Sequence, residues 1–333
     1  MAANLLALSA VALLLAGCAG LVGQRAAQRE ARAEATYPPT GRLLDVNGVQ
    51  VHAHVEGSGP DLVLLHGASG NTRDFTFGLV DRLKSDYRVI AFDRPGLGWT
   101  ETIGDDTANP IAQADLLRAA ADQLGVRNPI VMGHSYGGAV AMAWALRDPD
   151  GPSALVIVSG ATYPWPGEFG WWYPFISSRF GENVVVPLVT AFAPHRFAER
   201  VVIKGIFNPQ DVPPGYADYI GVGLSARRES FVANTRQIGK LKPYLQYMAP
   251  HYPELTQPIE VLHGNRDRIV GLELHSLAMV SQVPGASLTV LDGIGHMPHH
   301  AAPDEVVAAI HRAAERAGLR KAQLVPAAHG EGP

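Results

Sequence analysis

Residues 129–146 read PIVMGHSYGGAVAMAWAL, and this stretch is the strongest indication of the fold. The apolar run from Pro129 to Met132 predicts a buried strand, and the small-residue run from Gly138 to Leu146 predicts a helix. Between them, Gly133-His134-Ser135-Tyr136-Gly137 has the form G-x-S-x-G. A serine on so sharp a turn requires glycine two residues before and after it, because strand and helix approach closely there. We therefore expect the turn to expose the Ser135 hydroxyl as a nucleophile.

The rest of the chain repeats the strand and helix pattern of this stretch. A hairpin is predicted first, from Arg42–Val46 and Val49–Val55 joined by Asn47-Gly48. Continuous apolar runs predict strands buried on both faces, as in a parallel sheet covered by helices. These runs are residues 62–67, 87–93, 154–160, 259–264 and 287–293, and helical patterns fall at 71–84, 110–124 and 303–317. The sequence therefore predicts an α/β fold with a doubly wound, mostly parallel sheet.

One interval breaks the alternation. Residues 161–258 show no clear strand, and we expect them to form a cap over the carboxyl edge of a core made of 41–160 and 259–320. Eight aromatic residues fall within 161–180: Tyr163, Trp165, Phe169, Trp171, Trp172, Tyr173, Phe175 and Phe180. Aromatic side chains bury large apolar areas, so Trp171, Trp172 and Phe175 are candidates for binding an apolar part of a substrate. They would equally serve to dock the cap on the core, or to touch a lipid interface.

A serine nucleophile needs a base, and the base needs an acid to orient it. Chain order on this architecture predicts the acid and then the histidine after the serine. Asp267, just after the predicted strand 259–264, is the acid candidate, and His296 is the base candidate. Competitors for these two roles lie nearby, at Asp292, His299 and His300. A metal centre formed by these histidines is not expected, because no further cysteine or H-E-x-x-H spacing accompanies them.

An oxyanion hole needs two backbone donors near the serine. The N–H of Tyr136 directly follows the nucleophile candidate. The loop His66-Gly67-Ala68-Ser69-Gly70 offers the second donor, which we assign to the N–H of Ala68.

The motifs HGASG, DRPGLGWT, GHSYGG, HGNRD and GIGH occur in the order and spacing of the α/β-hydrolase superfamily, and the resemblance covers residues 41–320. DRPGLGWT resembles a segment of its capped branch, which holds esterases, lipases, perhydrolases, carbon–carbon bond hydrolases, epoxide hydrolases and haloalkane dehalogenases. The last two use aspartate where this chain has Ser135. The resemblance implies a cofactor-independent serine hydrolase acting on esters with an apolar moiety, or else a carbon–carbon bond hydrolase or perhydrolase. An alternative of another class is a non-catalytic, lipid-anchored envelope protein.

The composition limits the kinds of molecule that this chain is expected to bind. The chain has 333 residues with 47% hydrophobic and 17% charged residues, a formal net charge of −4, and no long basic run. This balance argues against nucleic acid as a partner, and the resemblance implies a small-molecule ester or other acyl substrate. The single cysteine excludes an internal disulfide.

That cysteine, Cys18, follows a 13-residue apolar run at positions 4–16 that suits the core of a signal peptide. Leu15-Ala16-Gly17-Cys18 resembles the lipobox of bacterial lipoproteins, although residues 1–17 lack the usual Lys or Arg. The resemblance implies cleavage of 1–17, lipidation of Cys18, a partly helical tether over 18–40, and export to a bacterial membrane. An ordinary secretory signal and an uncleaved anchor are the alternatives. Residues 321–333 are predicted to form a flexible tail.

Overall fold

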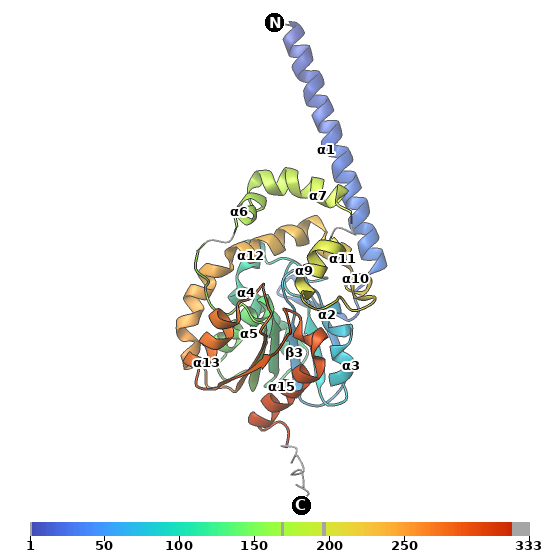
Figure 1. The fold of residues 1–333 in the computed structure, drawn as a ribbon. Coiled ribbons are helices and arrows are strands. Elements are labelled where there is room, and N and C mark those ends of the chain that lie inside the picture. The colour runs from blue at the N-terminus through green and yellow to red at the C-terminus, as the bar shows by residue number, and fades with distance from the viewer. Residues whose placement is uncertain (1, 168–169, 195–197, 322–333) are drawn as a thin grey trace, which may run out of the picture.

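The computed structural model describes residues 2–167, 170–194 and 198–321 of the chain. Most of the predicted tail, and Phe169 among the cap aromatics, lie outside these residues. Figure 1 shows helix α1 (Ala2–Thr36) projecting from one end of the molecule, and the α/β core lies toward the other end. The helical cap lies between the two.

The core contains a single eight-stranded sheet in the order β1-β2-β4-β3-β5-β6-β7-β8. Strand β2 pairs antiparallel with both β1 and β4. The strands from β3 to β8 all run parallel to one another. This topology confirms the predicted fold class, including the antiparallel edge. The strands are β1 Arg42–Val46, β2 Val49–Glu56, β3 Asp61–Leu65, β4 Arg88–Phe92, β5 Ile130–His134, β6 Ala154–Val158, β7 Ile259–Gly264 and β8 Ala286–Leu291.

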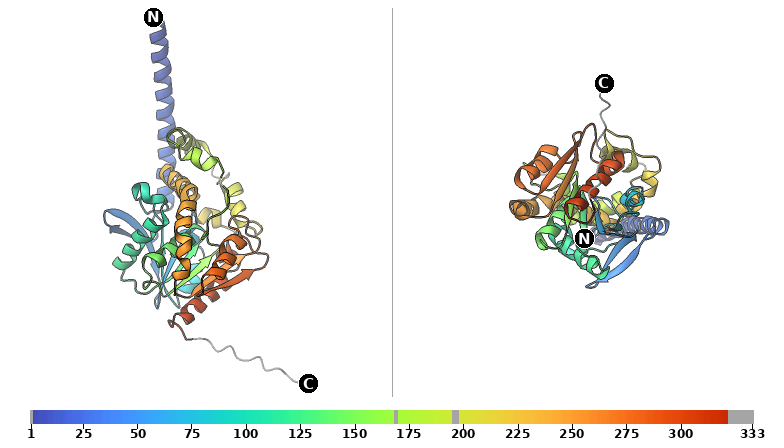
Figure 2. Two further views of the ribbon diagram at one scale, coloured as in Figure 1. Left: turned by 90° about the vertical axis from the view of Figure 1, so that its left-hand side faces the viewer. Right: turned by 90° about the horizontal axis from the view of Figure 1, so that it is seen from below.

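Helices cover both faces of the sheet, so its central strands are buried on both sides (Figure 2). In β3, Val63 and Leu65 pack in the core layer of α4, α5 and α13, whereas Leu62 and Leu64 pack in the layer of α3 and α15. The predicted helix 71–84 is two short helices, separated at Phe77-Gly78. The core helices are α2 Arg73–Thr76, α3 Leu79–Leu83, η1 Gly104–Ala108, α4 Pro110–Gln123, α5 Tyr136–Arg147, η5 Glu273–Leu277, α13 Ala278–Gln282, α14 Pro298–Ala301 and α15 Pro303–Arg316.

The regular secondary structure of the described cap residues is all helical, with loops between the helices. Its longest element, α12, runs beside the core and carries side chains toward the loop after β3. The other cap elements are short. They are α6 Trp172–Ile176, η2 Gly181–Val185, α7 Val186–Phe192, η3 Ala198–Ile203, α9 Lys204–Phe207, α10 Tyr216–Tyr219, α11 Val222–Ser225, α12 Arg228–Met248 and η4 Ala249–Glu254.

Helix α1 is not detached from the cap. Its Ala26 and Ala33 are buried, and Arg25 and Arg29 donate hydrogen bonds to the backbone oxygen of Ala191, at the end of α7. The segment predicted as a tether is therefore helical as far as Thr36 and packs against the cap. Among the residues that the structure describes, no helix is long and apolar enough to cross a bilayer.

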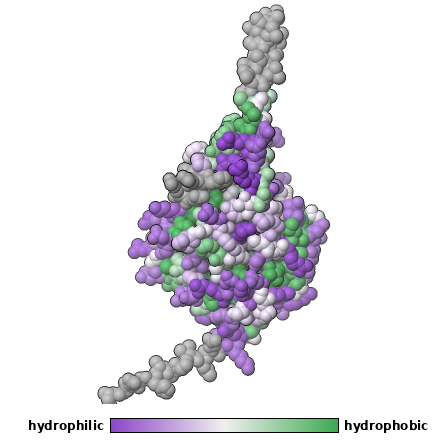
Figure 3. Space-filling view, turned by 90° about the vertical axis from the view of Figure 1, so that its right-hand side faces the viewer, coloured by the Kyte–Doolittle hydropathy of each residue, from purple (hydrophilic) through white to green (hydrophobic). Residues whose placement is uncertain are grey.

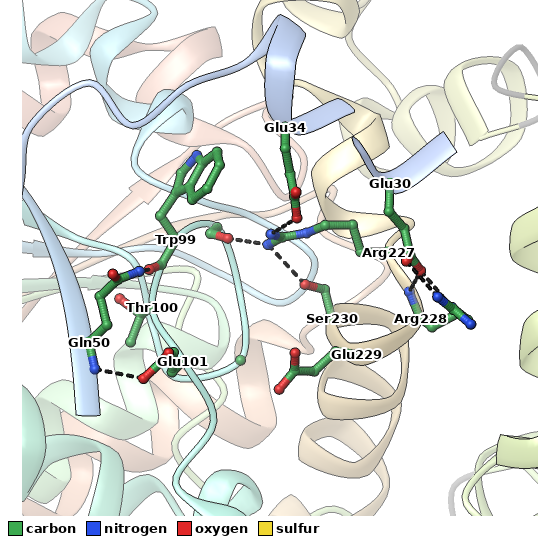
Figure 4. A pocket seen from close by; sticks show the side chains of 12 residues that line it. Glu30, Glu34, Gln50, Trp99, Thr100, Glu101, Arg227, Arg228, Glu229 and Ser230 are labelled. Carbon is green, nitrogen blue, oxygen red and sulfur yellow. Dashed lines mark hydrogen bonds and ion pairs between the residues drawn. The ribbon is translucent and has the colours of Figure 1, made fainter. Parts of the chain in front are cut away.

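Two ion pairs join α1 to the start of α12. Glu30 accepts two hydrogen bonds from the Arg228 guanidinium at 2.8 Å, and Glu34 accepts one from Arg227 at 3.1 Å. These pairs line a cavity of about 520 Å³ between α1, α12 and the loop that contains Trp99 (Figure 4). Ser135 and the other predicted catalytic residues do not line it.

Candidate active site

The turn around Ser135 has a strained backbone, and steric contacts require glycine on either side of it. Ser135 has φ 53° and ψ −118°, a left-handed conformation that a non-glycine residue rarely adopts. A Cβ atom at Gly133 would collide with the backbone of Gly137, and one at Gly137 would collide with the carbonyl oxygen of Leu65. Glycine at these two positions lets β5 and α5 meet at the turn, as the motif predicts.

The structure brings the three predicted catalytic residues together. The Ser135 hydroxyl lies 3.0 Å from Nε2 of His296, and Nδ1 of His296 lies 2.7 Å from Oδ2 of Asp267. With the ring proton on Nδ1 donated to Asp267, Nε2 accepts from the Ser135 hydroxyl. This arrangement can move a proton from Ser135 to His296 as the hydroxyl attacks a carbonyl carbon.

Asp267 is held in its ionised form. Its Oδ1 accepts from the backbone N–H groups of Ile269 at 2.8 Å and Val270 at 3.0 Å, and Nε2 of His263 lies 3.2 Å from Oδ2. Burial by itself raises the pKa of Asp267. The hydrogen bonds from His263 and His296, and the attraction to His296 when that ring is protonated, lower it by more. The pKa of Asp267 therefore lies well below its ordinary value, and the carboxylate stays available to orient His296.

Both predicted oxyanion donors lie beside Ser135. Tyr136 is the first residue of α5, so its N–H has no acceptor within the helix. Gly67 packs so closely on the nucleophile that a Cβ there would lie 3.0 Å from Cβ of Ser135. Ala68, which follows Gly67, is half-buried at this edge.

Residues 62–309 match the model of a protein family described as the alpha/beta hydrolase family. The chain belongs to this family. The hydrolase is 27% identical over 265 residues to 2-hydroxymuconate semialdehyde hydrolase of Pseudomonas sp. (strain CF600), covering 78% of this chain and 88% of that protein.

Solved structures share the fold. The esterase RhEst1 from Rhodococcus sp. superposes with a TM-score of 0.64 at 21% identity, over 82% of this chain and 98% of that chain. A membrane phospholipase A superposes with a TM-score of 0.64 at 22% identity, over 95% of this chain and 99% of that chain.

The loop with Ala68 is also fixed by the cap, which the sequence did not indicate. Asn234, on α12, accepts from the Ser69 backbone N–H at 2.6 Å and donates to the Ser69 hydroxyl at 2.8 Å. The Ser225 hydroxyl donates to the backbone oxygen of Ser69 at 2.7 Å. No local pattern marks Asn234, because its partner lies 165 positions away along the chain.

Arg94 supports the same loop from the core side. Its fully buried guanidinium donates to the backbone oxygens of His66 and Gly67, and to the side-chain oxygens of Gln113 and Gln237. It also lies 4.3 Å from the ring centre of Tyr136, in a cation–π contact. Burial lowers the pKa of Arg94 to about 10, so the side chain is charged at neutral pH. The motif DRPGLGWT contains this arginine, but the sequence alone gave it no role.

The competing polar residues have other partners. Asp292 accepts from Asn265 at 2.7 Å, and His299 and His300 contact the buried carboxylate of Asp74 at 3.1 and 2.8 Å. Asp74 also accepts from the Tyr216 hydroxyl of the cap at 2.7 Å.

Asp74, His134 and His299 place potential ligand atoms within 4.8 Å of one another. Both oxygens of Asp74 accept hydrogen bonds from Tyr216, His299 and His300, whereas Nδ1 of His134 and Nδ1 of His299 are buried without a hydrogen-bond partner.

The predicted substrate-binding aromatics lie at the surface of the cap. Trp171 is 76% exposed, Trp172 43% and Phe175 36%. The three rings contact one another, with centroids 5.9–6.3 Å apart. Trp171 is exposed over most of its surface and is open to a substrate or a lipid, whereas the larger buried parts of Trp172 and Phe175 leave the docking role open to them.

Proposed function

We propose that this hydrolase cleaves carboxylic esters through an acyl-enzyme intermediate, with Ser135 as nucleophile, His296 as general base and acid, and Asp267 as the residue that orients His296. The observation that carries the proposal is the unbroken chain of contacts from the Ser135 hydroxyl through both ring nitrogens of His296 to the buried Asp267 carboxylate.

The chemistry follows from these positions. Ser135 Oγ attacks the ester carbonyl as its proton passes to Nε2 of His296, and the N–H groups of Tyr136 and Ala68 donate to the oxyanion. His296 then gives the proton to the departing alkoxide, so the alcohol leaves and the acyl group stays on Ser135. In the second half, water attacks the acyl carbonyl as one of its protons passes to His296, and His296 returns that proton to Ser135 Oγ as the acid leaves.

Turnover of p-nitrophenyl esters from acetate to palmitate tests the proposal. The wild type is compared with Ser135→Ala, and with Ser159→Ala as a matched control, because Ser159 is a buried serine after the neighbouring strand β6. We expect turnover to be lost in Ser135→Ala and kept in Ser159→Ala. Equal turnover by the wild type and Ser135→Ala would contradict the proposal.

A second candidate function is hydrolysis of a carbon–carbon bond with the same three residues. The relative named 2-hydroxymuconate semialdehyde hydrolase, matched over 88% of its length, favours it. Turnover of that semialdehyde, followed by its absorbance, separates the two functions. A rate on it far above the rate on every ester would replace the ester proposal.

A further inference from the structure

The cap carries a contiguous apolar surface made of Trp171, Trp172, Phe175, Phe180, Val184 and Leu188, all exposed. We name it the apolar cap face. Four of its aromatic rings form one chain of contacts, which ends with Phe175 and Phe180 at 6.3 Å. Single exposed apolar residues are ordinary, but a clustered set of this kind marks an interaction surface.

The position of α1 indicates what covers this surface. Figures 1 and 2 show α6 and α7 at the end of the molecule from which the N-terminal half of α1 projects. No charged residue precedes Arg25 in the sequence. The guanidinium of Arg25 lies 5.0 Å from the ring centre of Phe192, the last residue of α7. The uncharged part of α1 therefore ends where the helix reaches α7 of the cap.

The uncharged part of α1 and the apolar cap face both suit contact with a lipid bilayer. An uncharged helix and an exposed aromatic cluster, aligned at one end and bordered by arginines, match the layering of a bilayer surface. Figure 3 shows hydrophobic residues gathered where α1 meets the cap. Arg179, between Phe175 and Phe180 in the sequence, is exposed and makes no ion pair with the described residues, so its guanidinium is free to meet lipid phosphate.

We propose that the apolar cap face binds the surface of a phospholipid bilayer, beside the point where α1 enters it. α1 is fixed to α7, so either a lipid on Cys18 or the uncharged helix itself would hold the cap against the membrane. Given the proposed ester hydrolysis, the substrates would be esters with apolar chains that partition into the bilayer. The cap would then take these esters up at the bilayer surface. Helix α12, which carries Asn234, contacts the Ser69 loop on the core side.

Quenching of tryptophan fluorescence by brominated phosphatidylcholine tests the contact directly. The full-length protein is reconstituted into vesicles of phosphatidylcholine with and without phosphatidylglycerol. We expect the brominated lipid to quench the wild type, and the quenched fraction to be lost in Trp171→Phe/Trp172→Phe, which keeps an apolar face. Equal quenching of both proteins would overturn the proposal, because it would come from the other tryptophans.

Activity gives an independent readout. Phe180→Ser/Val184→Ser/Leu188→Ser should lower the rate on long-chain esters held in vesicles by about tenfold or more and leave the rate on soluble p-nitrophenyl butyrate within about twofold. A matched control is Leu43→Ser/Leu277→Ser/Val290→Ser, three exposed apolar residues of the core. Equal losses in both triple variants would overturn the proposal.

A second copy of this chain is the competing occupant. Sedimentation in detergent that shows a dimer converted to a monomer by the cap substitutions would assign the face to self-association and overturn the proposal. Failure of the ester assay leaves the quenching test intact, so the failure of the proposed function and the failure of this inference are distinguishable.

Discussion

Asn234 and Ser69 are joined by two hydrogen bonds, one to the backbone N–H and one to the hydroxyl of Ser69. Ser69 follows Ala68, so a cap helix sets the position of the loop that carries the proposed oxyanion donor. Substitution of the cap residue should therefore change catalysis, although Asn234 lies outside the proposed triad.

We predict that Asn234→Ala lowers kcat by about tenfold, with KM for a short soluble ester little changed. Two hydrogen bonds worth about 0.5–1.5 kcal/mol each position the loop, and about 1.4 kcal/mol corresponds to a tenfold change in rate. Steady-state kinetics checks this, with Ser225→Ala as a milder comparison that removes one bond to Ser69. An unchanged kcat in a folded Asn234→Ala protein would show that the cap does not position the donor.

Arg94 should not tolerate replacement by lysine. A lysine ammonium cannot reproduce a planar guanidinium that donates to four oxygens, including those of His66 and Gly67. We expect Arg94→Lys to lose roughly 3 kcal/mol or more of unfolding free energy, measured by urea denaturation, and to lose kcat. Arg118→Lys, at a partly exposed arginine that pairs with Asp115 and Asp148, is the control and should cost under about 1 kcal/mol. Similar losses in both variants would argue against this role for Arg94.

Acid should destabilise the fold through buried histidines. Nδ1 of His275 accepts from the backbone N–H groups of Thr162 and Tyr163, and burial lowers the pKa of this histidine to about 4. The unfolded chain binds a proton near pH 6.5 and the folded chain does not, so this contribution is complete above that pH and is lost as the pH falls toward 4.

Melting temperatures between pH 7 and pH 4 check this sign. The decline should be shallower in His275→Gln, whose amide oxygen accepts hydrogen bonds without titrating in this range. The exposed His251→Gln serves as the control and should follow the wild type. Parallel curves for all three proteins would exclude His275 as a source of the pH dependence.

The ion pair between Glu30 and Arg228 should couple α1 to the cap. Arg228→Glu and Glu30→Arg should each lower the melting temperature, and the double exchange should restore part of the loss, with a coupling of about 0.5–1 kcal/mol because the pair is partly exposed. The same exchange at Asp122 and Arg127, an exposed pair at 3.8 Å, should show no coupling. Additive effects at Glu30 and Arg228 would mean that the pair does not hold α1.

The sequence predicted those features that are encoded locally. The strands β1 and β7 have the predicted bounds, because their apolar runs stop at turn residues. Ser135, Asp267 and His296 could be chosen as candidates because each follows a strand end in a recognisable short motif, and the structure places their side chains in contact. Asn234 and the contact of Arg94 with Gln237 were not predicted, because each joins segments more than 100 residues apart. The packing of α1 on the cap escaped prediction for the same reason.

The most direct test of the central claim is covalent labelling of the folded protein by a fluorophosphonate, followed by mass spectrometry of its peptides. Nucleophilic attack by Ser135 expels fluoride and leaves the phosphonyl group on its oxygen. We predict one adduct per chain, located on Ser135, and slow labelling in His296→Ala because the base is gone. A folded wild type without an adduct, or with the adduct on another residue, would contradict the account.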